Sequence, residues 1–89
     1  MKIVKVGAMW CPSCLITNKF WKEIKKEYQN IEFIDLDIDM DEEVKDLNIG
    51  NTLPEIIIFN SVGKEVKRLV GEKTKSEIEK IIGEYNEVK

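Results

Sequence analysis

The spacing of apolar residues changes several times along the chain, and each change marks the border of a predicted element. Lys2–Val6 is short and rich in β-branched residues and is followed by Gly7, which predicts a strand. From Pro12 to about Tyr28 the apolar residues recur at spacings of three, four and eight, which predicts an amphipathic helix. Ile31–Ile38 alternates between apolar and acidic residues, most clearly at its far end, and predicts a second strand.

The second half of the chain contains shorter segments. A short helix is predicted over Asp41–Leu47, because turn-forming residues follow it directly. Glu55–Phe59 is an apolar run of strand length. After a turn that contains Gly63, the segment Glu65–Val70 is its predicted antiparallel partner.

The last predicted element is a helix that follows Gly71. Thr74 and Glu77 have the spacing of a capping box. An apolar stripe at helical spacing comes next, formed by Ile78, Ile81, Ile82 and Tyr85. The order of elements is therefore β-α-β-α-β-β-α. It predicts an α/β fold, in a single domain over residues 1–89, with a central four-stranded mixed sheet and helices on both faces.

Composition and charge narrow the classes of partner. The net charge is −3, Arg68 is the only arginine, and the lysines are spread along the chain, so we expect neither nucleic acid nor an anionic membrane as a partner. No segment approaches the roughly 20 apolar residues that span a bilayer. The N-terminus has no signal-peptide pattern, so we expect a cytoplasmic monomer in which thiols are kept reduced.

The candidate chemistry lies in the only two cysteines, Cys11 and Cys14, which stand where the first strand passes into the first helix. This position makes Cys11 the expected N-cap and Pro12 the first helical residue. Unpaired N–H groups and the helix dipole favour a thiolate at that point, and a thiolate is the form that attacks disulfides. Cys14 lies nearly one turn further on, on the same face and deeper, as suits a resolving thiol.

Three other interpretations of the pair are weaker. A zinc site normally needs four ligands, and the chain has no histidine and no third cysteine, which leaves only a metal shared across a dimer. A structural disulfide across so short a loop removes little entropy from the unfolded chain. Two buried thiols without a function would not need the start of a helix. We therefore expect a redox-active Cys11–Cys14 disulfide and no bound cofactor.

The chain resembles the thioredoxin family over nearly its whole length. The segments that carry the resemblance are "WCPSC" at the strand-to-helix junction, "NTLPEIIIF" at Asn51–Phe59, and "VGEKTKSEIEKII" at the end. A full-length thioredoxin has an additional N-terminal strand and helix, so the chain is most similar to the minimal core that thioredoxins share with glutaredoxins.

The resemblance implies a substrate-binding surface. It implies that the Leu53–Pro54 peptide bond is cis and faces Cys11, whereas only about 5–6% of X–Pro bonds in folded proteins are cis. The Leu53 backbone would then offer strand-like hydrogen bonds to an extended substrate segment. Trp10, Pro12, Leu53, Pro54 and Gly71 would form a flat apolar surface around Cys11.

One position departs from the family pattern. Thioredoxins usually bury an acid six residues before the first cysteine and pair it with a lysine of the next strand. Lys5 occupies the first position and Asp35 aligns with the second, so the two charges are exchanged. Our hypothesis is that a Lys5–Asp35 pair lies beneath Cys14 and manages its proton. The alternative is a Lys5 ammonium that reaches the surface beside a solvated Asp35.

The resemblance implies a thioredoxin-like protein-disulfide reductase, recycled by thioredoxin reductase or by glutathione. A glutathione-linked enzyme is the first alternative, since "CPSC" and "TLP" are similar to glutaredoxin motifs. Trp10 favours thioredoxin, and Ala8 stands where glutaredoxins often carry a glutathione-binding lysine. A non-catalytic binding module or a metal carrier is a further alternative.

Overall fold

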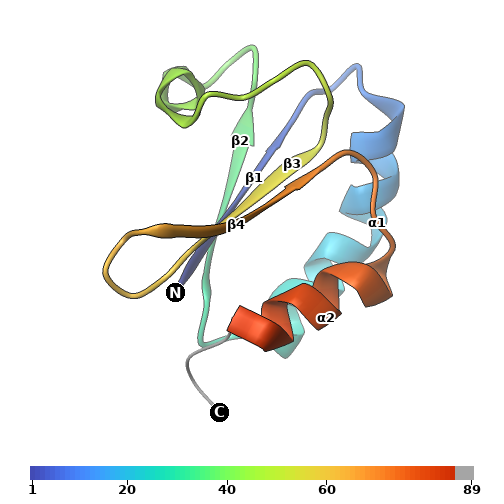
Figure 1. Ribbon diagram of the computed structural model, residues 1–89. Helices are drawn as coiled ribbons and strands as arrows, with labels where there is room; N and C mark the ends of the chain where they lie inside the picture. The colour runs from blue at the N-terminus through green and yellow to red at the C-terminus, as the bar shows by residue number, and fades with distance from the viewer. Residues whose placement is uncertain (86–89) are drawn as a thin grey trace.

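The structure, a computed structural model, describes residues 1–85 (Figure 1). Its elements in chain order are β1 (Lys2–Gly7), α1 (Pro12–Glu27), β2 (Glu32–Asp37), the 3₁₀ helix η1 (Glu42–Leu47), β3 (Glu55–Phe59), β4 (Glu65–Val70) and α2 (Lys75–Tyr85). All the predicted elements are present, and their borders shift by at most a few residues. The short helix is a 3₁₀ helix that ends at Asn48 in the left-handed conformation.

The four strands form one mixed sheet in the order β2-β1-β3-β4, which confirms the predicted fold class. β1 pairs in parallel with β2, and α1 makes the crossover between them. β1 pairs antiparallel with β3, and β3 pairs antiparallel with β4 through a tight turn. The central strands β1 and β3 are buried on both faces, which explains the apolar run Ile56–Phe59 in β3 and the burial of Lys5 within β1.

Helices cover both faces of the sheet, unequally. Figure 1 shows α1 and α2 side by side on one face, with η1 on the other. The core beneath the two long helices is rich in isoleucine and contains Ile3, Trp21, Ile24, Ile31, Ile56, Ile58, Leu69, Ile78 and Ile82. Each buried isoleucine contributes about 1.5–3 kcal/mol by leaving water, so this cluster is the main source of stability.

A second apolar cluster connects the η1 face to the cysteines. It contains Val4, Val6, Ala8, Cys11, Cys14, Val44 and Leu53. It lies where β1 ends and α1 begins, so the thiols are part of the packed interior at that end of the sheet.

The predicted capping box at the start of α2 is confirmed. The Glu77 backbone N–H donates to Thr74 Oγ1 at 3.1 Å, and the Thr74 N–H donates to Glu77 Oε1 at 3.3 Å. These two bonds satisfy donors that a helix start otherwise leaves without a partner, which fixes where α2 begins.

Candidate active site

Cys11 is the N-cap of α1 and Pro12 is the first helical residue, as predicted. The Cys14 N–H donates to Cys11 Sγ at 3.3 Å, so an unpaired amide of the helix start points at the sulfur. The Cys11 thiol also lies 3.7 Å from the Leu53 carbonyl oxygen. Both cysteines are free thiols, and both are buried.

Cys14 is held as a neutral thiol. Its side chain is 3% exposed. Burial raises the pKa of the Cys14 thiol to about 11, and a hydrogen bond with Cys11 acts in the same direction. The positive charge of Lys5 acts against this rise. Both sulfurs lie in the apolar interior, and they differ in that an amide of the helix start points at Cys11 while burial raises the pKa of Cys14.

The segment before β3 lies against Cys11. The Leu53–Pro54 bond is cis, as the resemblance implied, and both side chains are buried. The Gly71 N–H donates to the Pro54 carbonyl at 2.9 Å, which ties this segment to the end of β4. Gly71 has φ +87°, a conformation that L side chains rarely adopt, so glycine suits this turn.

Exposed apolar side chains gather beside the buried thiols. Trp10 is 65% exposed, and its indole N–H donates to Asp39 Oδ2 at 2.7 Å. Met9 and Met40 are also exposed, as are Leu15 and Ile16 on the first turns of α1. Of these side chains, only Trp10 was predicted from the sequence to belong to the substrate-binding surface.

Asp39 is positioned by the turn that follows β2. The side chain of Asp37 accepts the Asp39 N–H at 2.8 Å and the Met40 N–H at 3.2 Å. The Asp41 side chain in turn accepts the Asp37 N–H at 2.7 Å. Asp37 and Asp41 thus form an Asx-type turn that orients Asp39 toward Trp10.

Lys5 is buried, which rules out the alternative in which its ammonium reaches the surface. The residue is 8% exposed, and its Nζ donates to Asn18 Oδ1, lies 3.9 Å from Asp35 Oδ1 and stands 5.5 Å from the centre of the Trp21 ring. Burial lowers the pKa of Lys5, and the charge of Asp35 opposes that change. The exchanged charges therefore do face each other across β1 and β2.

Asp35 is nearer the surface than its partner. Its carboxylate accepts the Trp21 indole N–H at 3.0 Å and pairs with Lys25 at 2.6 Å. The Lys5–Asp35 contact is longer than either of these, so Asp35 is shared between two lysines.

Two open cavities adjoin the site. One, of about 350 Å³, has Cys14, Lys5, Gly7, Asn18 and Asp35 among its lining residues. It reaches the Cys14 side chain because Gly7 has no side chain: a Cβ there would lie 3.2 Å from Cys14 Sγ.

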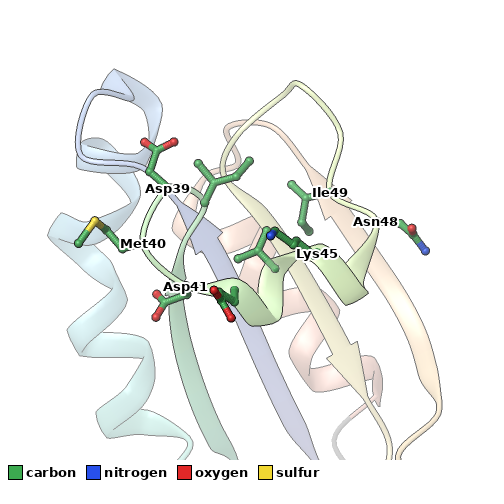
Figure 2. A pocket seen from close by; sticks show the side chains of 9 residues that line it. Asp39, Met40, Asp41, Lys45, Asn48 and Ile49 are labelled. Atoms are coloured by element: carbon green, nitrogen blue, oxygen red, sulfur yellow. The ribbon is translucent and has the colours of Figure 1, made fainter.

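The other cavity, of about 620 Å³, lies beside η1. Figure 2 shows Asp39 and Met40 at one end of it and Asn48 and Ile49 at the other. Within residues 1–85 no three Cys, Asp or Glu side chains are grouped so as to hold a metal ion, and no helix is both long enough and apolar enough to cross a bilayer.

The sequence profile of the thioredoxin family matches residues 1–84. Thioredoxin H8 of Arabidopsis thaliana is 30% identical over 86 residues, which cover 96% of this chain and 56% of that protein. Thioredoxin-1 of Saccharomyces cerevisiae is 29% identical over 69 residues, which cover 78% of this chain and 66% of that protein.

The solved structures agree. The crystal structure of a thioredoxin from Nicotiana alata superposes with a TM-score of 0.86 at 28% identity, over 97% of this chain and 73% of that one. Of the two curated relatives named above, the chain spans about half the length of the Arabidopsis protein and about two thirds of the length of the yeast protein. The profile match over residues 1–84, together with the fold, shows that the chain belongs to the thioredoxin family.

Proposed function

We propose that this protein is a thiol–disulfide oxidoreductase that reduces protein disulfides with Cys11 as the nucleophile and Cys14 as the resolving thiol. The observation that carries the proposal is the contrast between the two sulfurs. Cys11 Sγ accepts an N–H of the helix start, while Cys14 is buried with its pKa raised to about 11. This arrangement suits Cys11 to the first attack on the substrate disulfide and Cys14 to the later step that releases the substrate.

In the first step, the Cys11 thiolate attacks one sulfur of a substrate disulfide. A bond forms between Cys11 Sγ and that sulfur, the substrate disulfide breaks, and the second substrate sulfur leaves as a thiolate. The N–H of Cys14 and the dipole of α1 stabilise the attacking anion. Because Cys11 is 6% exposed, the substrate must present an accessible disulfide at the surface beside Trp10.

In the second step, Cys14 loses its proton and attacks Cys11 Sγ. The bond between Cys11 Sγ and the substrate breaks, the Cys11–Cys14 disulfide forms, and the substrate sulfur that Cys11 had attacked leaves as a thiolate, while the proton of Cys14 passes to solvent. A neutral, buried Cys14 needs help to ionise, and Lys5 is the cation whose charge favours its thiolate. Asp35 favours the charged form of Lys5. We assign both residues to this step, Lys5 by its charge and Asp35 by sustaining it.

Substrate docking is assigned to the surface around Cys11. Trp10 and Pro12 are exposed and offer apolar contact, while Leu53 and Pro54 are buried and offer backbone rather than side chain. The Gly71 N–H is hydrogen-bonded to the Pro54 carbonyl, so Gly71 lies at the edge of this docking surface. An extended substrate segment would pair with the Leu53 backbone next to Cys11.

The decisive experiment is to trap the intermediate. A Cys14→Ser protein incubated with a disulfide-containing protein such as insulin should accumulate a mixed disulfide through Cys11, visible as a reducible adduct by mass spectrometry. A Cys11→Ser protein is the control and should form none. Absence of an adduct in Cys14→Ser would reject the reductase function and favour a binding module or metal carrier.

The Cys11–Cys14 disulfide must be reduced again after each turnover. We propose reduction of the Cys11–Cys14 disulfide by a thioredoxin reductase in the cytosol, where thiols are kept reduced. Equilibration against reduced and oxidised glutathione, alongside incubation with a thioredoxin reductase and NADPH, separates the two sources of electrons. Turnover with glutathione alone would instead support a glutathione-linked enzyme.

A further inference from the structure

The only arginine of the chain joins three separate segments next to the substrate-binding loop. Arg68 Nη1 lies 2.5 Å from Glu55 Oε2 and donates to the Asn48 carbonyl at 3.3 Å. Its Nη2 and Nε contact Glu65 at 2.7 and 3.0 Å. We call the three residues Asn48, Glu55 and Arg68 the Arg68 cluster, and Glu65 lies at its exposed edge.

Glu55 is the unusual member of the cluster. It is the first residue of β3, directly after the cis Leu53–Pro54 bond, and it is 2% exposed. A carboxylate removed from water needs a charged partner and further hydrogen bonds. Arg68 supplies the charge, and the Gly50 N–H lies 3.5 Å from Glu55 Oε1.

The pairing of β3 with β4 explains why these side chains meet. Arg68 stands opposite Ile57, and Glu55 stands opposite Val70, so Glu55 and Arg68 are diagonal neighbours. Side chains two residues apart on a strand share a face, so both project on the same face of the sheet. From there the guanidinium reaches back to Asn48, at the end of η1.

The cluster therefore holds both ends of one loop. Arg68 binds the Asn48 carbonyl at the start, and Glu55 anchors the end while also accepting from Gly50. Between these points lies Leu53, whose carbonyl oxygen is 3.7 Å from Cys11 Sγ. Figure 1 shows this connection between η1 and β3 at the same end of the sheet as the start of α1.

We propose that Arg68 and Glu55 are positioning residues for the substrate-binding loop at 48–54. Their ion pair sets where the Leu53 backbone lies relative to Cys11, and so sets how an extended protein substrate docks. The inference rests on the proposed reductase function, because the experiment measures substrate docking by the rate of substrate reduction. A small disulfide that needs no pairing with Leu53 should be indifferent to the cluster.

The test compares two substrates across matched variants. Arg68→Met removes the charge and its hydrogen bonds, and Glu55→Met/Arg68→Met replaces the whole pair with apolar side chains, which often preserves stability. In both, kcat/KM for insulin reduction should fall roughly tenfold, mostly through KM, because small displacements of a positioning group cost that much or more. The rate with 5,5′-dithiobis(2-nitrobenzoic acid) should change less than about twofold.

Glu65→Gln is the control, because it weakens the exposed contact of Arg68 and leaves Asn48 and Glu55 bound. It should reduce insulin as the parent does. Equal insulin kinetics in the parent and the double variant would overturn the proposal. So would a parallel loss with both substrates, because that reports general damage to the fold or to Cys11.

Amide hydrogen exchange gives a readout that needs no activity. Exchange at residues 49–53 should be faster in Arg68→Met and in the double variant than in the parent, and unchanged in Glu65→Gln. Unchanged exchange in the double variant would also overturn the proposal. If the parent itself fails to reduce insulin, the proposed function fails, while the exchange data still decide whether the cluster orders the loop.

Discussion

The backbone of Gly7 lies directly against the side chain of Cys14. A Cβ at residue 7 would be 3.2 Å from Cys14 Sγ and 3.4 Å from Cys14 Cβ. The last residue of β1 therefore forms one wall of the site that holds the Cys14 thiol. The absence of a side chain there also leaves the 350 Å³ cavity in contact with Cys14.

Gly7→Val should therefore displace Cys14 and disturb resolution. Overpacking of a filled site costs about 1–3 kcal/mol, which urea unfolding would measure. The displaced thiol should attack Cys11 more slowly, so a mixed disulfide with insulin should persist on a quenched gel. Gly83→Val in α2 is the matched control, because a Cβ at Gly83 meets nothing within 4 Å. Resolution at the parent's rate in Gly7→Val would contradict the expectation.

Lys5→Met tests the assigned role of the buried ammonium. Removal of a charge that favours the Cys14 thiolate should raise the pKa of Cys14 further and slow release of the mixed disulfide by about three- to fourfold for each unit of pKa, because the thiolate fraction falls while the nucleophilicity of the thiolate rises. Stability should change little, because the remaining partner Asp35 is partly exposed and keeps its ion pair with Lys25. Stopped-flow quenching with gel analysis measures the release.

The control for Lys5→Met is Lys25→Met. Lys25 is the other lysine on Asp35, and it is partly exposed. The Lys25→Met variant should release the substrate from the mixed disulfide at a rate close to that of the parent. If Lys5→Met releases substrate as fast as Lys25→Met does, the assignment of Lys5 to resolution is wrong.

Local signals in the sequence predicted much of this molecule. β-Branched runs and helical spacing located the strands and the two long helices, turn-forming residues located the short helix, and the strand-to-helix position of Cys11 predicted its role as N-cap. The cis bond before Pro54 came from the family resemblance, because local preference favours trans. The burial of Lys5 was left open, because it depends on Asn18 and Trp21, which α1 brings over β1.

Other features had no local signal. Asp39 is one of them, because its hydrogen bond with the Trp10 indole depends on how two loops meet at one end of the sheet. Glu55 was read as the start of an apolar strand. Its burial against Arg68 depends on the register of β3 with β4, which the sequence pattern does not specify.

Thr74→Ala should lower the free energy of unfolding by about 1 kcal/mol, because it removes the N-cap acceptor of α2. Urea unfolding followed by circular dichroism measures this loss. Ser76→Ala, an exposed position just inside the same helix, is the control and should not destabilise the protein. Equal unfolding midpoints for Thr74→Ala and the parent would contradict the capping role.

Trp10→Ala should weaken protein substrates selectively. The side chain is 65% exposed, so stability should change by less than about 0.5 kcal/mol. Loss of a large aromatic anchor at an interface costs about 2 kcal/mol or more, so KM for insulin should rise at least roughly tenfold. Val62→Ala, exposed in the turn between β3 and β4, is the control. A KM for Trp10→Ala equal to that of Val62→Ala would remove Trp10 from the docking surface.

Because the pKa of Cys14 is raised in the folded state, the protein should become less stable as the pH rises. The unfolded thiol loses its proton near its ordinary value of 9.0, whereas the folded one keeps it to about 11. Within that window the folded state binds more protons, so the free energy of unfolding falls as pH rises. The parent should lose roughly 2 kcal/mol relative to Cys14→Ser between about pH 9 and 11.

Urea unfolding of the reduced proteins from pH 8 upward measures this difference. Subtraction of the Cys14→Ser curve removes the contribution of the lysines and tyrosines, which titrate in the same range. Thiolate absorbance at 240 nm, treated by the same subtraction, should rise with a midpoint near pH 11. Parallel stability curves, or a thiolate midpoint near 9, would mean that Cys14 ionises freely and needs no help from Lys5.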